Sequence, residues 1–181
     1  RDGMLVEAND GFSRITGYSL DEIAEQSTLS LGIWADPKDR ERLVQRIREQ
    51  GSVRDLIAPV RTKSGQLRLC ELSAQPLPIG GDECLLTIAR DITERQQMQE
   101  ELQQAATVFE STAEGVMITD PLQRIVAVNR AFSSVTGYSS EEVVGRTVTS
   151  LIGSREMRRQ YQMIRQELDS TGSWQGELIE T

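Results

Sequence analysis

The feature that most constrains this chain is an internal repeat. Residues 4–31 align with residues 124–151 at a constant offset of 120 without a gap, and 11 of these 28 positions are identical. Self-similarity at a fixed spacing indicates duplicated structural units. The 181 residues leave room for two small domains. We therefore predict repeat 1 at residues 1–92, a helical linker at residues 93–110 and repeat 2 at residues 111–181.

Both copies carry the same helix start and stop signals. Asn9 suits a helix N-cap, because its side-chain oxygen can accept a free backbone N–H. Gly17 suits the left-handed position that ends a helix, and Ser19–Glu22 has the capping-box pattern. The same residue types recur at Asn129, Gly137 and Ser139–Glu142. The simplest interpretation is that these polar residues form helix starts and carry no chemistry.

A longer helix follows in each copy. In repeat 1 it is predicted from the cap Asp36 to the terminator Gly51, with Leu43 and Ile47 on its buried stripe. In repeat 2 a second helix is predicted from Ser154 to Gly172. Apolar residues at helical spacing are more often core residues than ligand contacts.

Strands complete the predicted domain. Short strands are expected at Leu5–Val6 and at Ile125–Val126. After Gly51 we predict an antiparallel meander with a loop between its second and third strands. Its three strands are Val53–Val60, Gln66–Gln75 and Cys84–Ile92, its first turn is Lys63–Gly65, and the loop is Pro76–Asp82.

Composition excludes several classes of function. The 20 basic and 28 acidic residues give a net charge of −8, which argues against nucleic-acid binding and against attraction to an anionic membrane. There is no histidine, so histidine-ligated haem and histidine-based catalysis are excluded. The two cysteines, Cys70 and Cys84, are too few for a disulfide framework. No nucleophile–base pair, metal set or phosphate loop is found, so the chain is not predicted to be an enzyme.

The motif set resembles the PAS domain family of bacterial sensors. The resemblance is carried by Asn9, Phe12, Thr16–Ser19, Glu22, the turn at Lys63–Gly65 and the run Asp91–Arg95, and in repeat 2 by Asn129, Phe132, Thr136–Ser139, Glu142 and Gly145. It implies an α+β fold with a five-stranded antiparallel sheet and helices on one face. It also implies a cytoplasmic sensory and dimerisation module, free or belonging to a membrane-anchored sensor, that relays signals to a histidine kinase or a cyclic-di-GMP enzyme.

The resemblance also bears on cofactors. The photoactive cysteine of the flavin-binding branch is absent, because Thr28 and Val148 stand at its place, so neither covalent flavin nor haem is expected. Non-covalent flavin or another small molecule stays open. We expect a small apolar cavity around residues 29–47, with Trp34, Leu43 and Ile47 as pocket residues; the alternative for Trp34 is a partly buried anchor.

The linker combines a predicted relay with a predicted dimer seam. Asp91 should cap the linker helix and lie near Arg61 or Lys63, and it forms the relay together with Thr93, Glu94 and Arg95. An apolar stripe recurs at heptad spacing and predicts a parallel homodimer. Its members are Met98, Leu102, Ala105 and Phe109. The alternative is one amphipathic helix packed on its own domain.

Neither repeat contains every strand that the family implies. Repeat 1 begins after the place that corresponds to a strand at Gly115–Thr119, and repeat 2 has no counterpart of residues 66–92. We therefore expect the sequence to be cut from a longer chain, with both repeats truncated. A ligand-free structural PAS spacer is the alternative function. The tetrapeptide Gly80–Glu83 resembles the signature of diguanylate cyclases, but its place between two strands favours a turn.

Overall fold

The computed structural model describes residues 3–176, apart from the side chain of Glu156. The chain divides into two compact units, Arg1–Glu100 and Glu101–Thr181. The predicted end of repeat 2, residues 177–181, lies outside the described residues. No helix of the described part is both long and apolar enough to cross a membrane.

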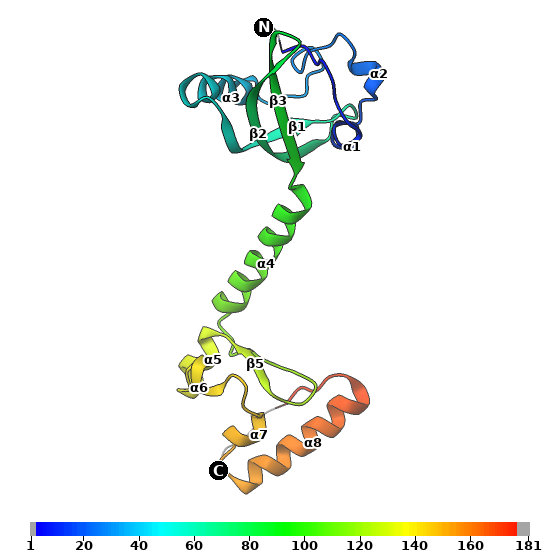
Figure 1. The fold of residues 1–181 in the computed structure, drawn as a ribbon. Coiled ribbons are helices and arrows are strands. Elements are labelled where there is room, and N and C mark those ends of the chain that lie inside the picture. The colour runs from blue at the N-terminus through cyan, green and yellow to red at the C-terminus, as the bar shows by residue number, and fades with distance from the viewer. Residues whose placement is uncertain (1–2, 177–181) are drawn as a thin grey trace. The chain divides into compact units, whose positions relative to one another are not determined.

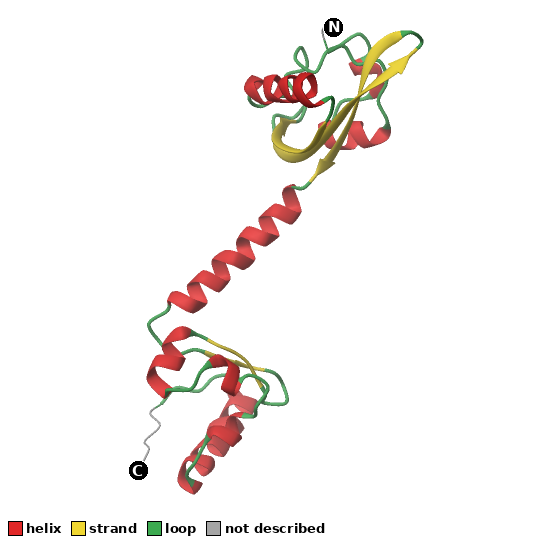
Figure 2. Cartoon of the chain, turned by 60° about the vertical axis from the view of Figure 1, so that its left-hand side comes forward, coloured by secondary structure: helices red, strands yellow, loops and turns green. Residues whose placement is uncertain are grey.

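Unit 1 contains three helices followed by a three-stranded meander (Figure 1). The helices are α1 (Asp10–Thr16), α2 (Leu20–Ile23) and α3 (Pro37–Gln50), and the strands are β1 (Val53–Arg61), β2 (Leu67–Ile79) and β3 (Asp82–Asp91). The sheet is antiparallel, in the order β1-β2-β3. Figure 2 shows these strands as one curved layer between helices and loops.

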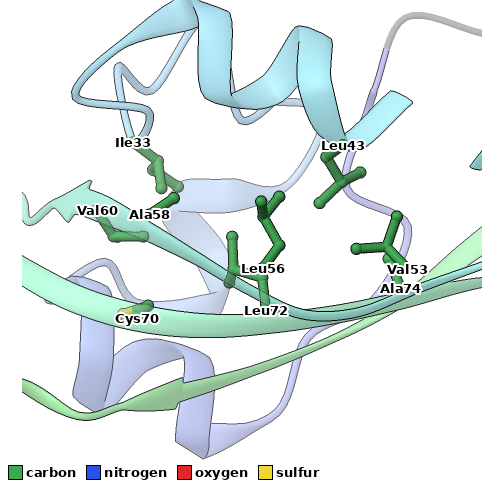
Figure 3. Packing of buried hydrophobic residues seen from close by; sticks show 9 residues of the cluster. All are labelled: Ile33, Leu43, Val53, Leu56, Ala58, Val60, Cys70, Leu72 and Ala74. Atoms are coloured by element: carbon green, nitrogen blue, oxygen red, sulfur yellow. The ribbon is translucent and has the colours of Figure 1, made fainter. Parts of the chain in front are cut away.

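The core of unit 1 lies on one face of this sheet. Residues on β1 and β2 alternate between buried and exposed positions, as expected for a sheet with one covered face. Leu43 of α3 and Ile33 of the preceding loop pack onto this face (Figure 3). The sheet contributes Val53, Leu56, Ala58, Val60, Cys70, Leu72 and Ala74. The prediction that Leu43 lies on the buried stripe of its helix is confirmed.

The predicted loop at Pro76–Asp82 is wrong, because the two strands run on as a hairpin. Only Gly80 and Gly81 turn, with φ of 61° and 94°, which only glycine adopts readily at two consecutive positions. Pro76 and Pro78 are tolerated because β1 begins at Val53, opposite Ala74, and does not run along this part of β2. Beyond that point β2 pairs with β3 alone and its other side is open. A proline there, which lacks an N–H, leaves no hydrogen bond to a neighbouring strand unmade.

Capping predictions are confirmed in both repeats. The side-chain oxygens of Asn9 and Asn129 accept the N–H of the residue three places on, at 3.1 and 2.9 Å. Gly17 and Gly137 end their helices with φ of 78° and 79°. The expected strand at Leu5–Val6 is not formed. In unit 2 the equivalent strand pairs with a neighbouring strand, whereas in unit 1 residues 3–9 form a single bridge, between Met4 and Ser27.

Helix α4 (Thr93–Ser111) leads from unit 1 into unit 2 and covers the residues predicted as a helical linker. Unit 2 contains β4 (Met117–Thr119), β5 (Ile125–Val128), α5 (Arg130–Thr136), α6 (Ser140–Val143), α7 (Val148–Leu151) and α8 (Arg155–Thr171). Its described sheet has the two antiparallel strands β4 and β5. The buried residues of its core are Ile125, Val128, Val143 and Val148.

Candidate functional site

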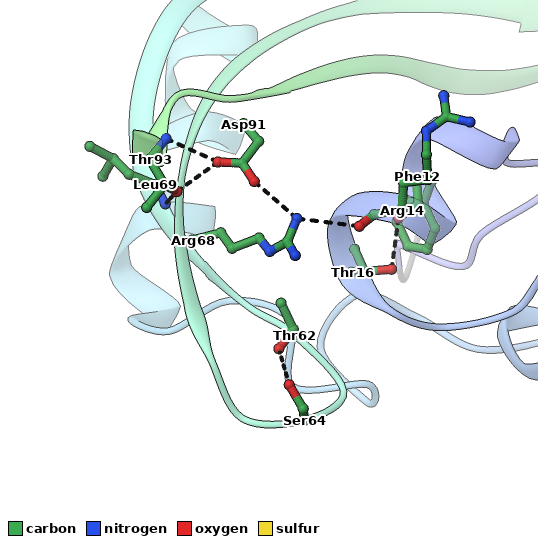
Figure 4. A network of polar contacts seen from close by, with 9 residues as sticks. All are labelled: Phe12, Arg14, Thr16, Thr62, Ser64, Arg68, Leu69, Asp91 and Thr93. Atoms are coloured by element: carbon green, nitrogen blue, oxygen red, sulfur yellow. Dashed lines mark hydrogen bonds and ion pairs between the residues drawn. The ribbon is translucent and has the colours of Figure 1, made fainter. Parts of the chain in front are cut away.

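The start of α4 is bound to the sheet of unit 1 by side-chain hydrogen bonds (Figure 4). Asp91, the last residue of β3, accepts the backbone N–H of Thr93 at 3.0 Å and its hydroxyl at 2.6 Å. The Thr93 hydroxyl oxygen in turn accepts the N–H of Leu69 on β2 at 2.8 Å. The predicted relay residues Asp91 and Thr93 are therefore brought together, and they join two strands to the first turn of the helix.

The basic partner of Asp91 is Arg68, at 3.0 Å between Nη1 and Oδ2, and neither Arg61 nor Lys63 as expected. Register explains the difference. Asp91 lies opposite the buried Cys70, so it points to the inner face, and Arg68 is two residues from Cys70 on the same face. Arg61 lies next to the inward-facing Val60 and therefore points to the outer face.

Arg68 also reaches α1. Its Nη1 donates to the backbone carbonyl of Arg14 at 3.3 Å, so one guanidinium nitrogen lies between α1 and the start of α4 (Figure 4). Arg68 was missed by sequence reasoning, because no motif singles it out. Alternate residues of a strand point to the same face, so a known register between β2 and β3 would have placed Arg68 on the same face as Asp91.

The charges at this junction shift two titrating groups. Burial raises the pKa of Asp91, but the hydrogen bonds from Thr93 and the adjacent Arg68 cation outweigh it, so the net pKa is lowered. Burial, followed by the negative charge of Asp91, raises the pKa of the Cys70 thiol to about 11. Cys70 is therefore a protonated core residue of low nucleophilicity.

Lys63 takes part in a separate contact. Its ammonium pairs with Glu22, whose carboxylate also accepts the Ser19 N–H at 3.0 Å in the capping box of α2. The hydrogen bond from Lys63 is the main reason that the pKa of Glu22 is lowered to about 2. Lys63 thus ties the β1–β2 turn to α2 and has no contact with Asp91 in the described structure.

The remaining predicted linker residues lie on the surface. Glu94 and Arg95 are exposed on the first turn of α4, and nothing joins them to Asp91 within residues 3–176. Among the predicted seam residues, Met98 is 53% and Leu102 73% exposed, Ala105 is exposed and Phe109 is half-buried. The helix buries no residue in this single chain.

The end of α4 is held by a residue that sequence reasoning assigned only to capping. Asn129 is 1% exposed, and its amide nitrogen donates to the carbonyls of Phe109 and Glu114 at 3.0 and 2.9 Å. Its oxygen accepts the N–H of Val116 at 2.8 Å in addition to that of Phe132. Asn9, its counterpart, is exposed and shows only the cap bond.

A second contact supports this end of the linker. The carboxylate of Glu110, in the last turn of α4, accepts the backbone N–H of Arg130 at 3.1 Å. Arg130 is the first residue of α5, so the contact crosses from the linker to the helix that Asn129 caps. Both residues are exposed, which makes this bond the weaker of the two links.

The predicted pocket residues are part of the core. Leu43 is buried, while Trp34 and Ile47 are partly buried and pack against the same cluster. The indole N–H of Trp34 donates to the hydroxyl of Thr28 at 3.1 Å. This arrangement fits an anchor, and contact with a ligand stays a prediction. Within the described ranges no cluster of three or more acidic or cysteine side chains is placed to hold a metal ion.

Comparison with known proteins identifies the family. The family described as PAS domain matches residues 1–94 and 113–181. Phototropin-1B of Oryza sativa subsp. japonica is 35% identical over 80 residues, which make up 44% of this chain and 9% of the phototropin, so the chain spans about a tenth of that relative.

Two solved structures illustrate the likeness. An RNA-binding light-oxygen-voltage receptor is 26% identical, with a TM-score of 0.47, over 59% of this chain and 31% of that chain. The PAS domain of a protein from Colwellia psychrerythraea is 23% identical, with a TM-score of 0.43, over 51% of this chain and 80% of that chain. On the family match, the chain belongs to the PAS domain family, and its repeats are sensory domains of the α+β PAS fold.

Proposed function

We propose that this chain is a tandem sensory and dimerisation module that passes a conformational signal along α4. One observation carries the proposal: polar side chains bind both ends of α4 to folded units, while its apolar stripe stays exposed. Asp91 and Thr93 hold the start of the helix, and Asn129 holds its end. A helix held at both ends can transmit a rotation or a shift from one sensor to the next.

The exposed stripe supports self-association. Leu102 is 73% exposed, which is unusual for a leucine in an apolar stripe of heptad spacing. Full burial of a leucine contributes ~1.5–3 kcal/mol, so covering the exposed part gains ~1–2 kcal/mol per chain. A symmetric dimer counts this gain twice, and Met98 and Phe109 add to it. The partner we propose is therefore a second copy of this chain, arranged in parallel.

The wider setting is carried over from the family resemblance. We propose a bacterial signalling protein that acts in the cytoplasm, in which this module controls a downstream output domain of the same chain. A histidine kinase or a cyclic-di-GMP enzyme are the proposed outputs, and catalysis belongs to that domain. The net charge of −8 supports partners other than nucleic acid.

A structural spacer without ligand is the second candidate. It is favoured by the packing of Trp34 and Ile47 against the core cluster, where we expected a cavity. The two candidates share the dimer and differ in ligand binding. Native mass spectrometry of the purified chain distinguishes them, since a small molecule that copurifies supports the sensor and its absence supports the spacer.

The dimer is tested by placing charge on the stripe. Leu102→Glu should convert a dimer at micromolar concentration into a monomer, because two like charges would meet at the seam. Gln104→Glu is the matched control: it adds the same charge at an exposed position of α4 on the side away from the stripe and should leave the dimer intact. Light scattering measures the mass, and a monomeric wild type or a dimeric Leu102→Glu variant contradicts the proposal.

A further inference from the structure

A pocket of about 280 Å³ lies between the end of α1 and the β1–β2 turn. It is at a different place from the cavity that we expected around residues 29–47. Its lining includes Gly17, Thr62–Ser64, Gln66 and Arg68. Ligand pockets commonly measure ~300–1,000 Å³, so this one lies just below that range and has room only for a small ion or molecule. No carboxylate residue lines it, although the chain as a whole is acidic.

Arg68 presents unused donors to this pocket. A guanidinium carries five N–H donors, yet the side-chain hydrogen bonds of Arg68 within residues 3–176 all involve Nη1. In Figure 4 the second terminal nitrogen lies on the side of Thr62 and Ser64. The side chain is 32% exposed, so water competes for this edge less than at an open surface. A planar edge with two free N–H groups matches the two oxygens of a carboxylate or a phosphate.

Other polar groups surround the same space. The hydroxyls of Thr62 and Ser64 lie 2.9 Å apart, so at most one of them uses its proton on the other. Lys63, which pairs with Glu22, is a second cation of the lining and is half-exposed. Arg14 meets Arg68 through its backbone carbonyl, and its guanidinium points away in Figure 4. The lining therefore includes the Arg68 guanidinium, two hydroxyl-bearing residues and Lys63, whose ammonium pairs with Glu22.

We propose that this pocket binds a small oxyanion, a carboxylate or a phosphate, on the free edge of Arg68. The same guanidinium holds Asp91 at the start of α4. A bound oxyanion competes with Asp91 for the positive charge of Arg68 and weakens the ion pair. Binding is thus coupled to the linker, and this second half of the inference rests on the proposed function of α4.

Titrations of the full chain with inorganic phosphate and with acetate test the site, followed by amide chemical shifts. We expect saturable shifts at Gly17 and residues 62–66, and the probe that binds more tightly identifies the oxyanion. Arg68→Gln should weaken binding at least ~10-fold, since the loss of a charge-assisted bond typically costs more than one decade. Arg61→Gln, on the outer face of the same hairpin, is the control and should bind as the wild type does.

Lys63→Gln keeps the test decisive if Arg68→Gln does not fold, since it should weaken binding several-fold while the Arg68–Asp91 pair stays. Shifts that do not saturate, or equal affinities in the wild type and in the cation variants, overturn the site. Asp91→Asn tests the coupling: freeing Arg68 should tighten binding ~3–10-fold, the size of ordinary linkage. Unchanged affinity in Asp91→Asn overturns the coupling alone, and the dimer test of Leu102→Glu is independent of both results.

Discussion

Asn129→Ala should destabilise unit 2 by more than Asn9→Ala destabilises unit 1, although both residues cap the equivalent helix. The repeat itself supplies the matched control. Asn9→Ala removes one exposed cap bond, which is worth ~1 kcal/mol. Asn129→Ala removes the same cap and also leaves the Val116 N–H without its partner, at ~1–3 kcal/mol. We therefore expect a loss of ~2–4 kcal/mol in unit 2.

Each unit carries one tryptophan, which makes the two losses separately measurable. Trp34 belongs to unit 1 and Trp174 to unit 2. In a Trp34→Phe background, urea unfolding followed by fluorescence reports unit 2, and in a Trp174→Phe background it reports unit 1. Equal losses for Asn9→Ala and Asn129→Ala, within ~0.5 kcal/mol, would refute the reasoning that the buried amide clamps α4.

A second substitution separates the two roles of Asn129, which caps α5 through its side-chain oxygen and binds the end of α4 through its amide nitrogen. Asn129→Asp keeps an oxygen that can accept the Phe132 N–H, but it loses the two N–H donors to the carbonyls of Phe109 and Glu114. Hydrogen exchange should then stay slow at the Phe132 amide and become faster in the last turn of α4. Equal acceleration at both places would mean that the cap and the clamp are not separate.

Three further predictions concern unit 1. At pH 8 a thiol reagent should label Cys84 quickly and Cys70 only as the protein opens, because burial raises the Cys70 pKa to about 11; fast labelling of Cys70, the one thiol left in Cys84→Ser, would contradict this. The pKa of Asp91 is lowered in the folded state, so its stabilisation is complete above its unfolded value and fades as the pH falls through the folded one. Asp91→Asn should therefore differ from the wild type in urea unfolding at pH 7, and the difference should shrink as the pH falls below the ordinary aspartate value of 3.8; a constant difference would refute the ion-pair argument. Leu43→Ala should cost ~2–5 kcal/mol and Ile57→Ala, on the exposed face of β1, less than ~1 kcal/mol, and similar unfolding midpoints for both would exclude the core as described.

Local signals allowed most elements to be predicted from the sequence. Asn9, Gly17, Asp36 and Gly51 each act within a few residues of themselves, so their roles depend little on the rest of the fold. The repeat made these signals stronger, because the same types recur 120 residues later. The long hairpin was missed for a related reason. Pro76 argues against a strand locally, and only the strand pairing shows that β1 begins opposite Ala74, so that Pro76 faces no neighbouring strand on that side.

Contacts that depend on register or on neighbouring elements could not be predicted in the same way. Arg61, Lys63 and Arg68 are all close in sequence, and only the strand pairing shows which of them shares a face with Asp91. Likewise, no property of Asn129 in the sequence distinguishes it from Asn9. The difference arises because α4 ends beside Asn129, where α4, α5 and the loop before β4 supply backbone groups to its amide.

The two ends of α4 differ in how easily they can be altered. At its start, the Arg68–Asp91 pair is about one-third exposed on both sides, and such pairs contribute ~0–1 kcal/mol. At its end, the amide of Asn129 is buried and fully bonded, with an expected contribution several times larger. Coupling energies between sites are typically ~1–3 kcal/mol. That range exceeds the contribution of the Arg68–Asp91 pair but does not clearly exceed the contribution of the Asn129 hydrogen bonds. A signal should therefore change the junction at Asp91 first, while the junction at Asn129 stays intact and passes the movement of the helix to unit 2.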